Sequence, residues 1–240
     1  MSDPVPSLAS FPPGGVALVV GAGGGIGSAL ETALAASGRF AAVLGTRRAG
    51  PLALDLTDEA SISSAIATVA ELGEIRLVVD ATGALHGNGF SPEKSLRDLN
   101  PAHLAHAFAI NAIGPALLMK HVLPQLPRAG KSMFAILSAR VGSIGDNRLG
   151  GWHAYRASKA ALNQLVRTAA IELARRAPEA TCVALHPGTV DTALSTPFAK
   201  TGLDVHSPPD AATHLLNVMD ALGPAQSGGF YDWRGEPIPW

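Results

Sequence analysis

The sequence predicts an α/β fold, in which a doubly wound parallel β-sheet of about seven strands is covered by helices on both faces. Short apolar runs rich in β-branched residues alternate along the chain with longer segments whose apolar residues recur at helical spacing. The first apolar run leads directly into a cluster of glycines and then into a helical segment. Strands separated by helices pair in parallel, and a parallel sheet needs cover on both faces.

One domain accounts for the length and the composition. The chain has 240 residues, of which 47% are hydrophobic, and a chain of this size buries roughly 70% of its unfolded surface. We expect a flexible N-terminal lead over residues 1–13 and a single domain over residues 14–240. The lead carries Asp3 and several prolines, and it lacks the basic start and apolar core of a signal peptide.

Charge and cysteine content bear on partners and location. The net charge is −1 with both signs interspersed, so we expect neither nucleic acid nor a membrane as a partner. No uninterrupted apolar run approaches the roughly 18 residues of a spanning helix. The single cysteine, Cys182, lies in an apolar run and is expected to be a small buried core residue in a reducing compartment. These features favour a cytoplasmic protein.

The first strand, turn and helix form a candidate phosphate-binding unit. Residues 16–20 have the β-branched content of a strand, and residues 28–37 have helical spacing. Glycines between them permit close backbone approach, and the free N–H groups at a helix start attract a pyrophosphate. The spacing is Gly-x-x-x-Gly-x-Gly. The residues expected to contact a dinucleotide here are Gly21, Gly23, Gly25, Ile26 and Gly27.

The end of the second strand, residues 41–45, bears on the choice of cofactor. In dinucleotide folds an acid about 20 residues past the glycines binds the ribose 2′-hydroxyl, whereas an arginine accommodates a 2′-phosphate. Arg47 occupies that position, Arg48 follows, and no Asp or Glu is close in the sequence. The sequence therefore favours NADP(H). The alternative is that both arginines only solvate a turn.

The segment after Arg47 is too short for an ordinary crossover. Only residues 48–54 separate it from Asp55, while a parallel connection with its helix needs about a dozen residues or more. We expect no helix there and a short edge strand near residues 52–56. The elements expected after it are helices over 58–72, 101–124 and 207–222 and strands over 75–80, 131–138, 181–185 and 228–233.

Two histidines on the expected helix from residue 101 have a spacing that suits a metal. His103 and His106 are three residues apart. No third ligand lies in register, so we expect no metal and two surface or interface histidines instead.

Tyr155 and Lys159 are the main candidates for chemistry. Four residues is one helical turn, so both side chains project from the same face. A cation beside a phenol favours the phenolate and lowers a pKa that is normally near 10. Taken alone, the pair is a weak signal, because helices carry such pairs by chance and the simpler interpretation is a solvated lysine beside a half-buried tyrosine. Together with the glycine turn it indicates acid–base chemistry on a bound dinucleotide.

These motifs resemble the short-chain dehydrogenase/reductase family over residues 14–240, and within it the C-factor and sniffer-type carbonyl reductases. Residues 109–124 are similar to the family's helix with a catalytic Asn, here Asn111, and residues 185–192 to its Pro-Gly segment. The resemblance implies a Rossmann-type sheet and reduction of a small ketone or aldehyde by NADPH. Further cofactor contacts implied by it are Asp55, Leu56, Ala81, Thr82, Gly83, Pro187, Gly188 and Val190.

The resemblance also implies roles for the catalytic residues. Tyr155 would protonate the carbonyl oxygen, and Lys159 would bind the nicotinamide ribose and lower the pKa of Tyr155. Asn111 would hold a water that links Lys159 to solvent. The helices that carry Asn111 and Tyr155 would form a homodimer or homotetramer.

Two segments depart from the family pattern. Residues 80–83 read Asp-Ala-Thr-Gly where the family has Asn-Asn-Ala-Gly, so Asp80 or Thr82 must make the usual hydrogen bonds. The usual catalytic serine position is Ala139, which leaves Ser138 at the strand end or, as a close rival, Ser143. The third possibility is that no serine takes part in the site.

The substrate itself stays open. Residues 194–207 form a candidate lid of mixed polarity, and Trp152 and His153 are candidates for the pocket wall. A non-catalytic dinucleotide-binding sensor or signalling protein is the main alternative function. A dehydratase or epimerase would need further acid–base residues that the sequence does not identify.

Overall fold

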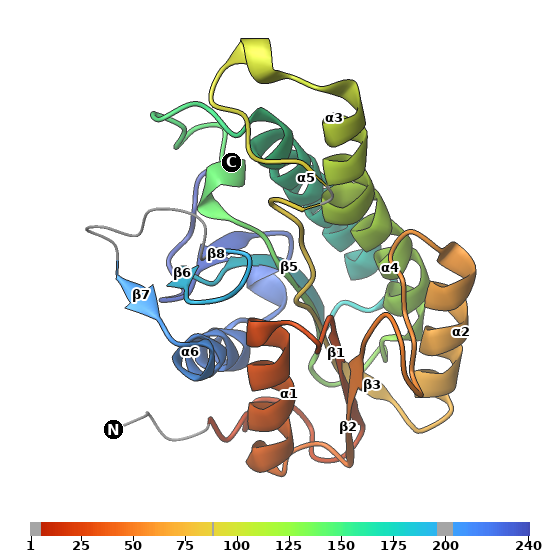
Figure 1. Cartoon of the computed structure of the whole chain (residues 1–240). Helices are drawn as coiled ribbons and strands as arrows, with labels where there is room; N and C mark the ends of the chain where they lie inside the picture. The colour runs from red at the N-terminus through yellow and green to blue at the C-terminus, as the bar shows by residue number, and fades with distance from the viewer. Residues whose placement is uncertain (1–5, 88, 196–203) are drawn as a thin grey trace.

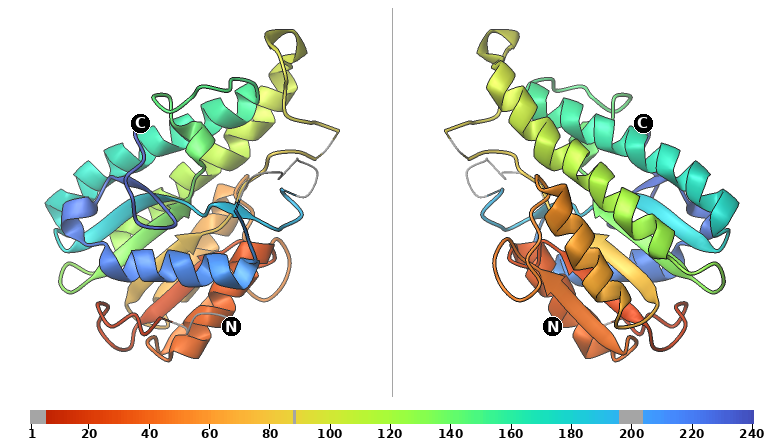
Figure 2. Two further views of the ribbon diagram at one scale, coloured as in Figure 1. Left: turned by 90° about the vertical axis from the view of Figure 1, so that its left-hand side faces the viewer. Right: turned by 90° about the vertical axis from the view of Figure 1, so that its right-hand side faces the viewer.

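The computed structural model describes residues 6–87, 89–195 and 204–240. Its centre is a parallel sheet of six strands in the order β2-β1-β3-β4-β5-β8, with helices on both faces (Figures 1 and 2). The predicted α/β fold is confirmed. The strands are β1 (Val16–Val20), β2 (Ala42–Thr46), β3 (Ile75–Asp80), β4 (Ser132–Leu137), β5 (Ala180–His186) and β8 (Phe230–Asp232), and a separate parallel pair is formed by β6 (Thr189–Val190) and β7 (Val205–His206).

The helices form two layers. They are α1 (Gly25–Ser37), α2 (Glu59–Ala70), α3 (Pro101–Phe108), α4 (Gly114–Val122), α5 (His153–Arg176) and α6 (Pro208–Ala221), with short 3₁₀ turns at Leu96–Asp98, Leu123–Gln125, Arg140–Gly142 and Pro224–Gln226. Helices α1 and α6 cover one face of the sheet, and α2, α4 and α5 cover the other (Figure 1).

Alternation along the strands produces a separate core on each face. In β1, Val16, Leu18 and Val20 pack in the cluster with α2, α4 and α5, whereas Ala17 and Val19 pack in the cluster with α1 and α6. All five side chains are buried, which explains why the strand reads as a continuous apolar run. Cys182 of β5 is buried in the same way, and burial raises the pKa of its thiol to about 12.

The strand order places a crevice at the carboxyl ends of the strands. Strand β1 pairs with β2 on one side and with β3 on the other, so the connections from these strands leave in opposite directions. Ligands of open α/β sheets bind at such a switch point.

The connection after β2 differs from the expectation in one respect. No helix lies between Thr46 and Glu59, as predicted. The expected edge strand over 52–56 is wrong, because only a single parallel bridge forms between Arg47 and Ala53. The chain turns at Asp55, whose carboxylate accepts hydrogen bonds from the backbone and the hydroxyl of Thr57 at 2.8 and 2.7 Å, and this turn ends the pairing.

The N-terminal lead is packed from residue 6 onward, so its expected flexibility is wrong there. Leu8 and Phe11 are fully buried in the core on the α1 and α6 face. The guanidinium of Arg39 donates to the carbonyl oxygens of Ala9 and Phe11, and the ammonium of Lys131 lies 4.5 Å from the centroid of the Phe11 ring. Residues 1–5 lie outside the described part of the chain, and the domain boundary at residue 14 stays a prediction.

The predicted helix over 101–124 contains an irregularity that the sequence did not indicate. A π-turn, Ala109–Ile113, connects α3 to α4 and carries Asn111. In the described chain, the continuous run Pro101–Gln125 is the one helix long and apolar enough to cross a membrane. The core helix of a soluble protein passes the same test, and this run packs against α2 and α5, so it is weak evidence for a membrane span.

Candidate active site

The glycine turn between β1 and α1 has the shape that the sequence predicted. Gly21 has φ +85°, and its carbonyl accepts from the N–H of Gly24 at 3.0 Å. A Cβ on Gly27 would collide with the carbonyl of Gly21, and a Cβ on Gly25 would lie 2.9 Å from the Thr192 methyl carbon. Gly27 therefore lets the helix start directly against the turn, and Gly25 lets the Thr192 side chain approach it closely.

These residues fit a dinucleotide. A Cβ on Gly23 would meet nothing within 4 Å except the Arg47 side chain at 3.7 Å, so the turn leaves its outer face open. Helix α1 begins at Gly25 without a side-chain cap or an acid in its first turn. Its first N–H groups are thus available to the pyrophosphate of a bound dinucleotide.

Arg47 has an acidic partner that its sequence neighbours did not reveal. Its guanidinium lies 2.7 Å from the carboxylate of Glu31 on α1. No acid is close to Arg47 in the sequence, but the fold places one beside it. The reason is that α1 packs beside β2, which brings together residues 16 positions apart.

Asp55 and Leu56, two of the cofactor contacts that the resemblance implies, differ in burial. The hydroxyl of Thr57, and then its backbone N–H, hold the pKa of the Asp55 carboxyl below its usual value. Leu56 points into the core, where a Cβ on Gly114 would meet it. Of this pair, Asp55 alone presents its side chain near the surface.

The turn after β3 is held by its own side chains. The Asp80 carboxylate accepts from the N–H and the hydroxyl of Thr82 at 2.9 and 2.5 Å, as the departure from the family's asparagines requires. Asp80 is fully buried, and burial raises the pKa of its carboxyl. Beyond Ala81 and Thr82, a Cβ on Gly83 would lie 3.6 Å from both the Lys159 ammonium and the Asn111 amide oxygen. This turn therefore adjoins the candidate catalytic residues.

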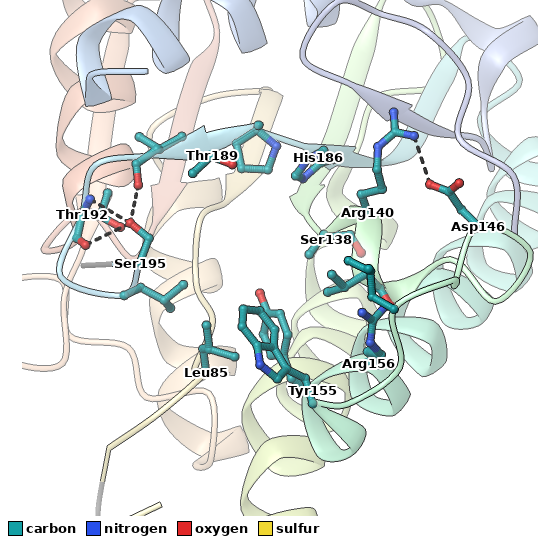
Figure 3. Close-up of a pocket in the computed structure, with 18 of the residues that line it drawn as sticks. Leu85, Ser138, Arg140, Asp146, Tyr155, Arg156, His186, Thr189, Thr192 and Ser195 are labelled. Atoms are coloured by element: carbon teal, nitrogen blue, oxygen red, sulfur yellow. Dashed lines mark hydrogen bonds and ion pairs between the residues drawn. The ribbon is translucent and has the colours of Figure 1, made fainter. Parts of the chain in front are cut away.

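A cavity of about 690 Å³ lies at the carboxyl ends of β4 and β5. Figure 3 shows the hydroxyl of Tyr155 directed into it, with Ser138 and His186 on the far side. Arg47 and Asp55 are not among its lining residues and lie at the β2 edge. The predicted site residues that line the cavity are Ile26, Ser138, Trp152, Tyr155, Pro187, Gly188 and Val190.

Tyr155 and Lys159 lie on the first two turns of α5, and both are buried. The Lys159 ammonium donates to the Leu137 carbonyl at 2.8 Å and lies 6.0 Å from the centroid of the Tyr155 ring. Burial raises the pKa of Tyr155 to about 12 and lowers that of Lys159 to about 8, against an opposing effect of Asp80. The expected lowering of the Tyr155 pKa is therefore wrong for this arrangement, because desolvation of the phenolate dominates.

Asn111 is buried in the π-turn, and its amide bonds to protein. Its Oδ1 accepts from the Ala84 N–H at 2.9 Å, and its Nδ2 donates to the Ala84 carbonyl at 2.8 Å and the Ser158 hydroxyl at 3.1 Å. Both amide hydrogens are thus used, and one lone pair of Oδ1 is left for a water.

The structure separates the two candidate serines. Ser138 lines the cavity, and its hydroxyl donates to the Asn163 amide oxygen at 2.7 Å. Ser143 does not line it. Its hydroxyl donates to the Pro239 carbonyl and accepts from the Asp146 N–H, so Ser143 fixes the C-terminal segment.

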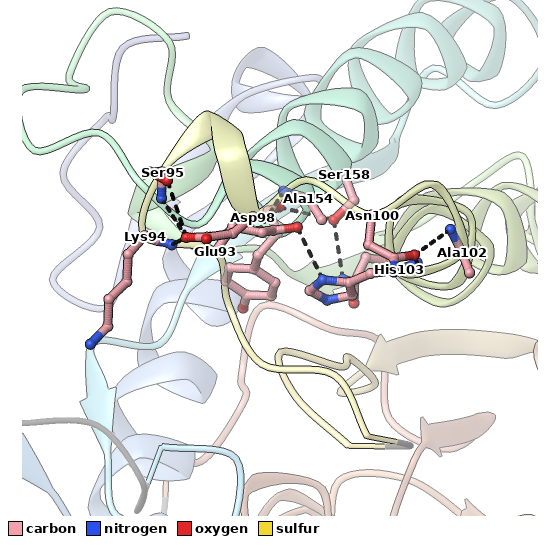
Figure 4. Close-up of polar contacts among 11 residues, drawn as sticks. Glu93, Lys94, Ser95, Asp98, Asn100, Ala102, His103, Ala154 and Ser158 are labelled. Carbon is pink, nitrogen blue, oxygen red and sulfur yellow. Dashed lines mark hydrogen bonds and ion pairs between the residues drawn. The ribbon is translucent and has the colours of Figure 1, made fainter.

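A buried acid that the sequence did not single out caps the helix that carries Tyr155 (Figure 4). The Glu93 carboxylate accepts from the Ala154 N–H in the first turn of α5, and the Glu93 carbonyl accepts from the Trp152 N–H. A negative charge at the N-terminus of a helix interacts favourably with the positive end of the helix dipole. Glu93 therefore fixes the turn that carries Tyr155.

The same acid pairs with a predicted surface residue. His103 Nδ1 lies 3.0 Å from the Glu93 carboxylate, and the His103 ring stacks on Phe90 with centroids 4.9 Å apart. The expectation of a surface or interface residue is wrong for His103, which is buried. The described residues contain no group of three or more His, Cys, Asp or Glu side chains suited to a metal.

Two further segments border the cavity. His186, which the sequence also did not single out, lines it, and burial lowers the pKa of its imidazole to about 4. The sequence could have identified His186 as a site residue, because it lies at the end of a strand and directly before Pro187. Of the expected lid, Leu194 and Ser195 line the cavity, while residues 196–203 lie outside the described chain.

Comparisons with known proteins agree with this geometry. The family model described as short chain dehydrogenase matches residues 15–202. C-signal of Myxococcus xanthus is 38% identical over 146 residues, which cover 61% of this chain and 84% of that protein. A 1-hydroxy-2-glutathionyl-2-methyl-3-butene dehydrogenase of Rhodococcus sp. (strain AD45) is 30% identical over 187 residues, 78% of each chain.

Similar solved structures include a crystal structure of NADPH-bound carbonyl reductase from chicken fatty liver. It superimposes with a TM-score of 0.83 at 27% sequence identity, and the match covers 95% of this chain and 100% of that one. With the family model spanning most of the sequence, the chain belongs to the short chain dehydrogenase family of oxidoreductases.

Proposed function

We propose that this protein is an NADPH-dependent reductase of small ketones or aldehydes. The main support for this function is that the Tyr155 hydroxyl points into a cavity of about 690 Å³. Ile26 of the glycine turn and Ser138 also line this cavity. A substrate bound there would meet both a proton donor and the nicotinamide end of a dinucleotide held by that turn.

Two observations support the phosphorylated cofactor. Arg47 and Arg48 follow β2 at the position where a 2′-phosphate is accommodated. The chicken carbonyl reductase, similar over its whole length, was solved with NADPH bound. Both arginines are exposed, and the Arg47 side chain lies beside Gly23 of the glycine turn.

In the proposed reaction, bound NADPH supplies the hydride, and the protein supplies the proton and the electrostatic environment. With its pKa raised by burial, Tyr155 is a neutral phenol at pH 7, which is the form that donates a proton to a carbonyl oxygen. Lys159, one turn further on, stabilises the phenolate left behind through its charge. Ser138 lies at the cavity wall, where a hydroxyl would hydrogen-bond the substrate oxygen.

The direct test is NADPH oxidation by purified protein across a panel of ketones, quinones and aldehydes, with Tyr155→Phe as the matched variant. Carbonyl-dependent oxidation that is lost in the variant supports the proposal. Binding of NADPH without oxidation of any panel member would instead favour the sensor or signalling role.

We also propose a cytoplasmic homodimer or homotetramer formed through the helices near Asn111 and Tyr155. Ile113 in the π-turn and Ile171 on α5 are large apolar side chains that are about half exposed, and association would cover them. Sedimentation equilibrium checks this, and a monomer at micromolar concentration would contradict it.

A further inference from the structure

An acid–base pair occupies the edge of the glycine turn. The Arg47 guanidinium contacts the Glu31 carboxylate at 2.7 Å and the Gly45 carbonyl at 3.4 Å. The Arg47 side chain passes over Gly23, in the middle of the turn. The pair therefore lies where the adenosine ribose of a dinucleotide held by this turn would bind.

The fold makes room for the acid. A Cβ on Gly45 would collide with the carboxylate of Glu31, so glycine at this position of β2 leaves the space that the acid fills. Glu31 comes from α1 and Gly45 from β2, and both elements flank the turn. Glycine at position 45 thus permits the Glu31 carboxylate to lie against β2 beside Arg47.

Stability alone does not account for the pair. Both side chains are solvent-accessible, at 47% for Arg47 and 28% for Glu31. Exposed ion pairs of this kind contribute little to folding. A function at the ligand site is the better explanation for an acid placed against the expected phosphate-binding arginine.

We infer that Glu31 is a specificity-determining residue that limits the preference for NADPH over NADH. This inference rests on the proposed use of a nicotinamide dinucleotide. A 2′-phosphate carries about two negative charges and must share Arg47 with the Glu31 carboxylate, which repels it. A free 2′-hydroxyl instead donates a hydrogen bond to a carboxylate in this place. Glu31 therefore favours NADH at the same position where Arg47 favours NADPH.

The test measures binding, not turnover. Fluorescence titrations give the Kd of NADPH and of NADH for the wild type, for Glu31→Gln, and for Glu172→Gln as a control. The Glu31→Gln change keeps an oxygen acceptor for Arg47 and removes the charge. Glu172 lies exposed in the second half of α5, so its variant removes one surface charge away from the turn. Competition by adenosine 2′,5′-bisphosphate isolates the contribution of the 2′-phosphate.

We expect Glu31→Gln to raise the ratio of Kd for NADH to Kd for NADPH about tenfold at low salt, and less as salt screens the repulsion. Adenosine 2′,5′-bisphosphate should bind tighter to the same extent, and Glu172→Gln should leave the ratio within about twofold. Glu31→Ala, which needs no particular rotamer, should shift the ratio in the same direction.

An unchanged ratio in both Glu31 variants, or weaker NADPH binding, would overturn the inference. If the wild type binds neither dinucleotide, the proposed function and this inference fail together. If both cofactors bind with the expected shift and no carbonyl is reduced, the proposed function fails and the role of Glu31 stands.

Discussion

The side-chain amide of Asn111 is bonded to both backbone groups of Ala84, with Oδ1 accepting at 2.9 Å and Nδ2 donating at 2.8 Å. This pairing joins the π-turn between α3 and α4 to the loop after β3. Gly83, next in the chain to Ala84, adjoins the Lys159 ammonium. Leu85, which follows Ala84, lines the cavity, so Asn111 fixes this part of the cavity wall to the helices α3 and α4.

Replacing Asn111 should destabilise the fold more than removing a helix cap. Asn111→Ala deletes three hydrogen bonds and leaves the partly buried N–H and carbonyl of Ala84 without this partner, at a cost of about 2–4 kcal/mol. Asn100→Ala, which removes the N-cap of α3, should cost about 1 kcal/mol. Urea denaturation of both variants measures the difference, and equal losses would show that the Ala84 contacts contribute little.

Tyr155→Phe should separate binding from chemistry. The change deletes one oxygen and keeps the ring that packs beside Trp152, so NADPH binding should survive. Turnover should fall by at least the roughly 10²–10⁴-fold typical of a general acid. NADPH titration and kcat on one active carbonyl provide the two readouts. Carbonyl reduction at the wild-type rate would exclude Tyr155 as the proton donor.

The buried ammonium of Lys159 should make stability depend on pH. Its folded pKa is lowered from 10.5 to about 8, by burial above all, so between these values the unfolded chain binds more protons than the folded one. Stability then rises with pH in this window. The cost of burying the charge is fully present below pH 8 and is relieved as pH increases toward 10.

Lys159→Met isolates this effect, because Tyr155 is present in both proteins. The wild type should gain stability relative to Lys159→Met as pH increases from about 8 to 10, as measured by denaturation at several pH values. A constant difference between the two proteins would mean that the Lys159 pKa is not lowered in the folded state.

Arg47→Asp should reverse cofactor preference. The wild type should bind NADPH more tightly than NADH, because each charge-assisted hydrogen bond to the phosphate contributes roughly 1.5–3 kcal/mol. The variant would place a second acid beside Glu31 and should bind NADH more tightly. Arg97→Asp, at an exposed position in the loop before α3, is the control. A preference for NADPH that persists in Arg47→Asp, by fluorescence titration, would refute the assignment of Arg47.

The sequence predicted those features that depend on local patterns. Strand β3 (Ile75–Asp80) matches the expected range without error, because its six residues are all buried and, apart from Arg76, are apolar up to the terminal Asp80. The glycine turn was also predictable, since its spacing reflects backbone collisions within a few residues. Tyr155 and Lys159 could be paired because one helical turn separates them.

Features created by tertiary packing were missed. Glu31 reaches Arg47, and Glu93 reaches the first turn of α5, across elements that are far apart in the chain. The pKa of Tyr155 was expected to fall because the sequence shows a neighbouring cation, but the burial that raises it depends on the assembled cavity. Leu8 shows the same limit, since a Pro-rich lead does not reveal that its apolar residues complete the core.

The hydrogen bonds of Ser138 and Ser143 indicate which of the two serines can bind a substrate oxygen. Ser138 lines the cavity but donates its hydroxyl hydrogen to the Asn163 oxygen at 2.7 Å. The Asn163 Nδ2 is buried with no hydrogen-bond partner among the described residues. Rotation of that amide would let Nδ2 donate to Ser138 and free the serine hydrogen for a substrate oxygen. Ser143 has no such freedom, because its hydroxyl donates to the Pro239 carbonyl of the C-terminal segment and accepts from the Asp146 N–H of its own turn.

Ser138→Ala should therefore lower kcat, with NADPH saturating, by about 10²–10³-fold, the usual effect of removing one donor to a developing oxyanion. Ser143→Ala should lower kcat less than tenfold and reduce stability by about 1 kcal/mol, because it releases the Pro239 carbonyl and the Asp146 N–H. The reverse result would place Ser143 in the site despite its bonds. If neither change lowers kcat tenfold, polarisation of the substrate oxygen rests on Tyr155, since the Asn111 amide hydrogens are already used, and no serine belongs to the catalytic machinery.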